Sequence, residues 1–199
     1  MNRLVTIVRA ESAASLPDYA SVSIAFDTTE RLDLAAAGVD QAATDARVVP
    51  LSAPITKDYD AIAGNHPLDW RSRFDVRPWL FLGAYRSGRR VGGAIVISGD
   101  ATVQMVEGRD DLALLWDLRV APDARGRGVG SALLRVAQDW AWARGHTTMK
   151  VETQDINVAA CRLYARHGFR LCVVDATAYP DFPDETQLLW YKTLAGQPD

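Results

Sequence analysis

One stretch constrains this chain more than any other, because an apolar run leads through a glycine cluster into a long amphipathic segment. The run LALLWDLRVAP at 112–122 predicts a strand, which its last proline ends. Three glycines follow, at Gly126, Gly128 and Gly130. Residues 129–144 then repeat apolar side chains at spacings of three and four, which predicts a helix. Such a strand, turn and helix start exposes backbone N–H groups that bind anions together with the helix dipole.

Two common phosphate-binding motifs do not fit this glycine loop. A Walker loop needs Gly-Lys-Ser/Thr, but Gly130 is followed directly by Ser131. A dinucleotide fingerprint needs G-x-G-x-x-G after the first strand, and this loop reads G-x-G-x-G after a later one. Arg125 and Arg127 add positive charge. The loop alone leaves two alternatives open: an anion site, or a tight glycine-rich turn with solvated arginines.

The remaining pattern predicts an α/β fold with a mixed sheet. A hairpin is expected around Ser87-Gly88, and Gly145 and Gly168 are expected to end two helices. Residues 11–75 carry mixed patterns and receive no assignment. The other expected elements are a strand at 4–10, hairpin strands within 79–97, a strand at 147–154, a helix at 157–168, and strands at 169–176 and 186–194, which a proline-containing loop at 179–185 separates.

Composition limits the class of protein and its partners. The 199 residues, 48% of them apolar, suit one globular domain. The apolar runs are too short to cross a bilayer, and the N-terminal run, which Thr6 and Arg9 interrupt, is unlike a signal peptide. A net charge of −3 without a long basic run argues against nucleic acid. Cys161 and Cys172 offer neither a disulfide framework nor metal-ligand spacing, so a cytoplasmic protein without a metal is expected.

Two blocks of the sequence resemble the GCN5-related N-acetyltransferase (GNAT) superfamily. The stretch RVAPDARGRGVGSALL matches that family's R/Q-x-x-G-x-G/A motif, with Arg125, Gly128 and Gly130 in the motif positions. The block VETQDINVAACRLYARHGF matches its second signature, with Asn157 and Tyr164. The resemblance covers residues 79–193. The second block and the LLWYK ending are similar to streptothricin acetyltransferases in particular, although Trp116-Asp117 stands where that group has an acidic pair.

The resemblance implies a fold, a domain division and an activity. The expected fold is a central mixed, mostly antiparallel sheet, splayed between its fourth and fifth strands and flanked by helices. Residues 1–199 would form one domain, with a variable acceptor-side part at 1–75 and an acetyl-CoA-binding core at 76–195. The implied activity is direct acetyl transfer from acetyl-CoA to a primary amine of a small cationic molecule, such as a streptothricin-like antibiotic. The alternatives are a protein N-terminal or lysine acetyltransferase, and a non-catalytic coenzyme A-binding module.

The resemblance also implies where acetyl-CoA binds. Its pantetheine would pair with the strand before the loop. Asn157 would contact the coenzyme as well as cap its helix. The backbone expected to hold the pantetheine and the pyrophosphate comprises Leu118, Arg119, Val120, Arg125, Gly126, Arg127, Gly128, Val129, Gly130 and Ser131.

Acetyl transfer needs one proton removed and another supplied. An alkyl ammonium (pKa about 10.4) must lose a proton, and a departing thiolate (about 8.5 for a comparable thiol) must gain one. Tyr164 stands at the family's position for the acid, and the alternative is that it only packs with Cys161. Asp117 and Glu152 are the candidate bases or amine contacts, with water as a relay. The alternative is that each pairs with a nearby cation such as Arg119 or Lys150.

Three further features of the sequence concern charge at the surface, a helix end and a contact with a second copy of the chain. Acidic residues gather at 106–111 and 175–185, where they would attract a cationic amine or simply face solvent. His167 is interpreted as a helix C-terminal residue rather than a base. Trp140 and Trp142 lie two apart on one helix, so one should face outward, which leaves a homodimer contact open.

Overall fold

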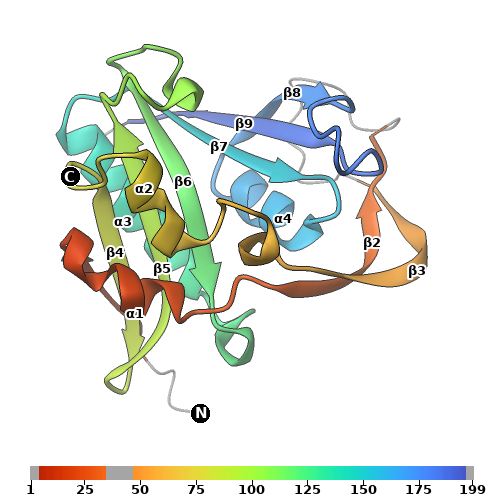
Figure 1. The fold of residues 1–199 in the computed structure, drawn as a ribbon, viewed down its shortest axis with the longest axis horizontal. Coiled ribbons are helices and arrows are strands. Elements are labelled where there is room, and N and C mark those ends of the chain that lie inside the picture. The colour runs from red at the N-terminus through yellow and green to blue at the C-terminus, as the bar shows by residue number, and fades with distance from the viewer. Residues whose placement is uncertain (1–4, 35–46, 196–199) are drawn as a thin grey trace.

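The computed structural model describes residues 5–34 and 47–195 (Figure 1). Within them the chain forms a seven-stranded sheet in the order β1-β4-β5-β6-β7-β9-β8. Only β6 and β7 run parallel, so the expected mixed, mostly antiparallel sheet is confirmed. The strands are β1 (Ile7–Glu11), β4 (Leu80–Arg86), β5 (Arg89–Ser98), β6 (Leu112–Val120), β7 (Thr148–Gln154), β8 (Arg170–Asp175) and β9 (Gln187–Thr193).

Local sequence signals explain the elements from β4 onward. Ser87 and Gly88 both have positive φ, of 48° and 79°, as a two-residue hairpin turn with the twist of its strands requires. The predicted strands and helices of this part are observed within a few residues of their expected ends. At the N-terminus β1 is also observed, whereas Leu4 of the expected strand lies outside the described residues.

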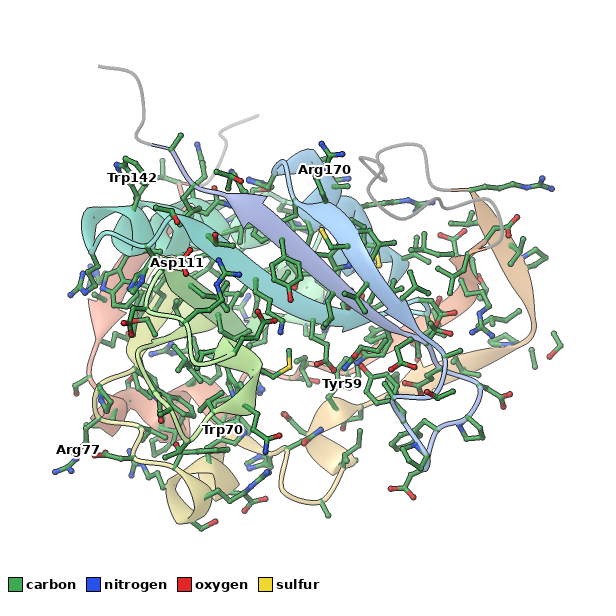
Figure 2. The ribbon with its side chains drawn as sticks, turned by 90° about the horizontal axis from the view of Figure 1, so that it is seen from above. Tyr59, Trp70, Arg77, Asp111, Trp142 and Arg170 are labelled. Atoms are coloured by element: carbon green, nitrogen blue, oxygen red, sulfur yellow. The ribbon has the colours of Figure 1, made fainter. Side chains whose placement is uncertain are left out.

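Helices cover both faces of the sheet (Figure 1). On one face, α3 (Val129–Ala143) and α4 (Val158–Arg166) bury their apolar sides in a large core together with Phe169 and Trp190. On the other face, α1 (Leu16–Ala20) and α2 (Trp70–Arg73) pack on a second, aromatic-rich core. Trp142 is 43% exposed near the end of α3, so one of the two tryptophans does face outward (Figure 2).

Of residues 11–75, for which the sequence predicts no elements, the described part includes a second, two-stranded sheet. β2 (Phe26–Leu32) and β3 (Val48–Lys57) pair as a separate antiparallel ribbon. The Arg31 guanidinium donates to the buried Asp155 carboxylate at 2.6 Å, and this contact holds the ribbon beside α4. Short 3₁₀ helices complete the described chain at Ala13–Ser15, Tyr59–Ala61, Pro67–Asp69, Gln104–Val106 and Pro122–Ala124.

The sheet opens between β6 and β7. These strands pair only from Leu112 to Leu115 on β6, and they then diverge (Figure 1). A bulge at Trp116 interrupts the pairing of β6 with β5 at the same level and bends the strand. The predicted splay between the fourth and fifth strands of the main sheet is therefore confirmed. Across the described residues, no helix is long and apolar enough to span a membrane, and no group of side chains has a metal-binding arrangement.

Candidate active site

A cleft of about 1130 Å³ lies where β6 and β7 diverge. Its walls come from the second half of β6, the glycine loop, the start of α3, the end of β7, α4 and segments of residues 24–70. Of the residues predicted for the site, Arg127 alone does not line the cleft. Those that do are Asp117, Leu118, Arg119, Val120, Arg125, Gly126, Gly128, Val129, Gly130, Ser131, Glu152, Asn157 and Tyr164.

The glycine loop presents unpaired backbone donors to this cleft. Gly126 and Gly128 have φ of +69° and +84°, a conformation that other residues rarely adopt. The first helical bond of α3 runs from Ala132 N to Gly128 O at 3.0 Å. Within the part of the chain that the structure describes, the N–H groups of residues 126–131 have no acceptor. The loop therefore has the donors and the helix dipole that an anion needs.

The two arginines of the loop act mainly as supports. The Arg125 Nε donates to Val120 O at 3.0 Å, and burial lowers the pKa of this guanidinium below its usual value. The Arg127 side chain is exposed, and its carbonyl accepts a bond from Arg86 on β4 at 2.6 Å. The backbone of the loop, rather than its side-chain charge, is therefore the main candidate for holding an anion.

The edge of β6 beyond the bulge is the second binding element. Leu118 to Val120 pair with β5 on one side, at Gly92–Ala94. On the other side β7 has moved away, so no described strand occupies that edge. An extended ligand that carries amide groups can pair with such an edge as an added strand.

Tyr164 combines a packed ring with a free hydroxyl. Its ring lies against Phe169 and Trp190, with centroid distances of 5.7 and 6.4 Å, and it also lines the cleft. No described residue makes a hydrogen bond to its hydroxyl. Burial, with nearby Cys161 and Asp117, raises the pKa of Tyr164 well above its usual value. The hydroxyl is therefore protonated at neutral pH, and no described residue accepts its proton.

Asp117 has strong partners within the protein. The Arg119 guanidinium contacts both carboxylate oxygens, at 3.0 and 2.9 Å, and Tyr19 donates a further hydrogen bond. Arg119 is itself completely buried and also binds Asp60 at 2.9 Å. For Asp117, the structure thus shows the alternative to a role as base, which is an ion pair with Arg119. Its carboxylate has little capacity left for an amine.

Glu152 has no such cation. Lys150, which the sequence offered as its partner, binds Glu107 at 2.7 Å instead. Among the described residues no lysine, arginine or histidine lies within ion-pair distance of Glu152. Its Oε1 accepts a hydrogen bond from the Tyr179 hydroxyl at 2.5 Å. Of the two predicted carboxylates, Glu152 is therefore the one that lacks a counter-ion.

The other predicted features behave as local structure. Asn157 caps α4, with its side chain accepting from Ala160 N at 3.2 Å, and it also lines the cleft. His167 is the C-cap of α4, and burial together with nearby cations lowers its pKa. In the acidic loops, Asp111 pairs with Arg109 and Glu185 with Lys57. These paired loop acids do not form a free anionic rim.

Several cleft residues lie in segments that carry no recognisable sequence pattern. Tyr59 and Asp60 follow β3 in a 3₁₀ turn, and Trp70 begins α2. Trp70 and Trp116 form an aromatic wall of the cleft, with ring centroids 6.1 Å apart. Tyr59 donates a short hydrogen bond to Gln154 on β7. No periodicity or motif in residues 11–75 marks these positions.

A comparison of the sequence with models of protein families identifies the family of this chain. The model of the Acetyltransferase (GNAT) family matches residues 50–169, which include β6, the glycine loop, α3, β7 and α4. The chain belongs to the GNAT acetyltransferase family.

Curated relatives of this GNAT protein include several streptothricin acetyltransferases. Streptothricin acetyltransferase A of Bacillus subtilis (strain 168) is 44% identical over 81 residues, 40% of this chain and 47% of that protein. The streptothricin acetyltransferase of Streptomyces lavendulae is 29% identical over 148 residues, 74% of each chain. An Escherichia coli streptothricin acetyltransferase is 38% identical over 93 residues, 45% of this chain and 53% of that protein. The chain thus spans about half the length of two of these relatives.

Solved structures share the fold of the GNAT protein over nearly its whole length. A nourseothricin acetyltransferase has a TM-score of 0.71 at 23% identity and covers 96% of this chain and 99% of its own. The structure of a protein described as a streptothricin acetyltransferase from Bacillus anthracis str. Ames, in complex with acetyl coenzyme A, has a TM-score of 0.73 at 20% identity. The match covers 96% of this chain and 100% of that chain. These likenesses confirm the GNAT fold that the sequence predicts.

Proposed function

We propose that this GNAT-family protein is an acetyl-CoA-dependent N-acetyltransferase that acts on a primary amine of a small cationic molecule, such as a streptothricin-like antibiotic. One observation carries the proposal. A single cleft contains a free N–H cradle, an open strand edge, a protonated tyrosine and a carboxylate without a counter-ion. The names of the curated relatives support the class of acceptor.

The residues that fit acetyl-CoA lie along the glycine loop and β6. The N–H groups of residues 126–131 are suited to the pyrophosphate, and the edge at 118–120 is suited to the amides of pantetheine. Acetyl-CoA supplies a thioester carbonyl that an uncharged amine can attack. Leu163 lies 3.2 Å from where a Cβ on Gly130 would be, so a larger side chain would disturb the contact between α3 and α4.

Glu152 and Tyr164 supply the proton chemistry in this proposal. The acceptor ammonium binds the Glu152 carboxylate, which has no other cationic partner, and a water passes one proton of the ammonium to the solvent, which leaves an uncharged amine. Tyr164 donates its proton to the departing thiolate. Asp117 instead supports the wall of the cleft through Arg119.

Thiol release from acetyl-CoA tests the function with a panel of acceptors. We expect release with streptothricin and with other small primary amines of positive charge. Their N-acetylated and N-trimethyl counterparts should give none, because these nitrogens cannot attack the thioester. Binding of acetyl-CoA without release for any amine would indicate a non-catalytic module. Release with lysine-containing or free-N-terminal peptides alone would indicate a protein acetyltransferase.

The glycine loop gives a prediction for coenzyme binding. Gly128→Ala should raise the Kd of coenzyme A about tenfold in calorimetry, because its φ of +84° disfavours a side chain and the loop must shift. Gly99→Ala is the matched control, since Gly99 has φ of +65° outside the cleft. The control should cost about 1 kcal/mol of stability and leave the Kd unchanged. Equal Kd values for both variants would contradict the assignment of the loop.

A further inference from the structure

Four side chains form a continuous hydrogen-bond chain that ends at Glu152. The Tyr59 hydroxyl donates to Gln154 Oε1. Gln154 Nε2 donates to the Tyr179 oxygen at 2.7 Å, and the Tyr179 hydroxyl donates to Glu152 Oε1 at 2.5 Å. Tyr59, Gln154 and Glu152 line the cleft, whereas Tyr179 does not. Tyr179 therefore contacts Glu152 without lining the cleft itself.

The chemistry of the groups fixes the direction of this chain. An ionised carboxylate only accepts, so the single proton of Tyr179 must point at Glu152. The amide of Gln154 must then donate to Tyr179, which leaves its oxygen for the proton of Tyr59. The opposite amide orientation would leave Tyr179 with two acceptors and one proton. Burial and the charge of Glu152 raise the pKa of Tyr179, which keeps that proton in place.

The chain joins three segments that are distant in the sequence. Glu152 and Gln154 lie two residues apart on β7, so both side chains project from the same face. Tyr59 belongs to the 3₁₀ turn after β3 and lies beside the end of β7 (Figure 2). Tyr179 belongs to the loop between β8 and β9. That loop is fixed by the ion pair of Lys57 with Glu185, at 2.5 Å.

We propose that Tyr179 is a positioning residue that fixes the Glu152 carboxylate for the ammonium group of the acceptor. Tyr179 occupies Oε1, and no described residue hydrogen-bonds Oε2, so that oxygen is open to a donor from the cleft. A carboxylate without a counter-ion would otherwise turn freely, and binding an amine would require it to be ordered first. The inference rests on the proposed function, and it assigns amine recognition to the loop between β8 and β9.

The test is a double-mutant cycle. Tyr179→Phe should lower kcat/KM for the amine at least tenfold, mainly through KM, and leave the Kd of acetyl-CoA unchanged. In a Glu152→Gln background the same change should have less than a twofold effect, because the positioned carboxylate is gone. Tyr191→Phe is the matched control. It removes a hydroxyl that donates to Glu107 at 2.6 Å outside the cleft, and it should leave kcat/KM unchanged.

Three results would overturn the proposal. These are an unchanged kcat/KM in Tyr179→Phe, an equal loss in both backgrounds, and a loss shared by Tyr191→Phe. If Tyr179→Phe fails to fold, Tyr59→Phe at the other end of the chain tests the same coupling, with a smaller rise in KM expected. A wild-type protein that binds acetyl-CoA without acetylating any amine refutes the proposed function itself. An active wild type with one of the three results refutes only the role of Tyr179.

Discussion

Tyr164→Phe should lower kcat by about 100-fold or more, because general acid catalysis contributes about 10²–10⁴ to such steps. The ring would keep its contacts with Phe169 and Trp190, so only the proton donor is lost. The Kd of acetyl-CoA should stay within about twofold. Steady-state kinetics at saturating substrates, with calorimetry of acetyl-CoA binding, measure both quantities.

Tyr85→Phe is the control for this variant. It also removes a tyrosine hydroxyl, but this one lies on β4 and donates to Glu11 at 2.6 Å outside the cleft. Its kcat should equal that of the wild type. An unchanged kcat in Tyr164→Phe would mean that the thiolate leaves without a proton from this tyrosine.

Arg119→Met should lower the free energy of unfolding by about 3–5 kcal/mol, because the change leaves two carboxylates without their shared cation. Arg119 is completely buried, and it contacts both Asp117 and Asp60 at 2.9 Å. Thermal unfolding should shift down by about 6–20 °C for a chain of this size. Urea titration of both proteins gives the free energies directly.

Arg89→Met is the matched control for Arg119→Met. Arg89 pairs with Asp123 at 2.6 Å, but both side chains are more than half exposed. Such a pair is worth about 0–1 kcal/mol, so the control should unfold almost as the wild type does. A loss below about 1 kcal/mol in Arg119→Met would contradict the account of the buried network. Adding Asp60→Asn to Arg119→Met should recover part of the loss.

The glycine-loop side of the cleft could be predicted from the sequence because its signals are local. Ser87-Gly88 fixes a hairpin within two residues, and the glycines at 126–130 fix a turn within five. Asn157 caps the helix that carries Tyr164 seven residues later. Each of these features depends on backbone conformation or on the periodicity of one element, which neighbouring residues determine.

The direction in which the β6 side chains point could not be predicted by applying regular strand alternation to the sequence. Ala113 and Leu115 face the core under α3 and α4. Regular alternation of side chains along the strand would place Asp117 on the same face. The bulge at Trp116 shifts the alternation by one residue. Leu118 then packs on that core, and Asp117 turns with Arg119 toward Tyr19 on the other face. The single residue inserted by the bulge therefore places Asp117, a predicted base, in an ion pair with Arg119.

The positions of Tyr59, Asp60 and Tyr179 depend on contacts between irregular segments. Tyr59 meets Gln154 across 95 residues of sequence, and Arg119 meets Asp60 across 59. Tyr179 lies in a loop, so no periodicity indicates which way its side chain points. These pairings form only when the ribbon and the loop pack against β7. They belong to tertiary structure and leave no local pattern.

The mass of the acceptor after incubation with acetyl-CoA tests the central claim most directly. Streptothricin treated with the wild-type protein should gain one acetyl group on an amine, at a rate that Tyr164→Phe reduces about 100-fold or more. An acceptor of unchanged mass, in the presence of protein shown by calorimetry to bind acetyl-CoA, would contradict the claim that this cleft transfers acetyl groups to small cationic amines.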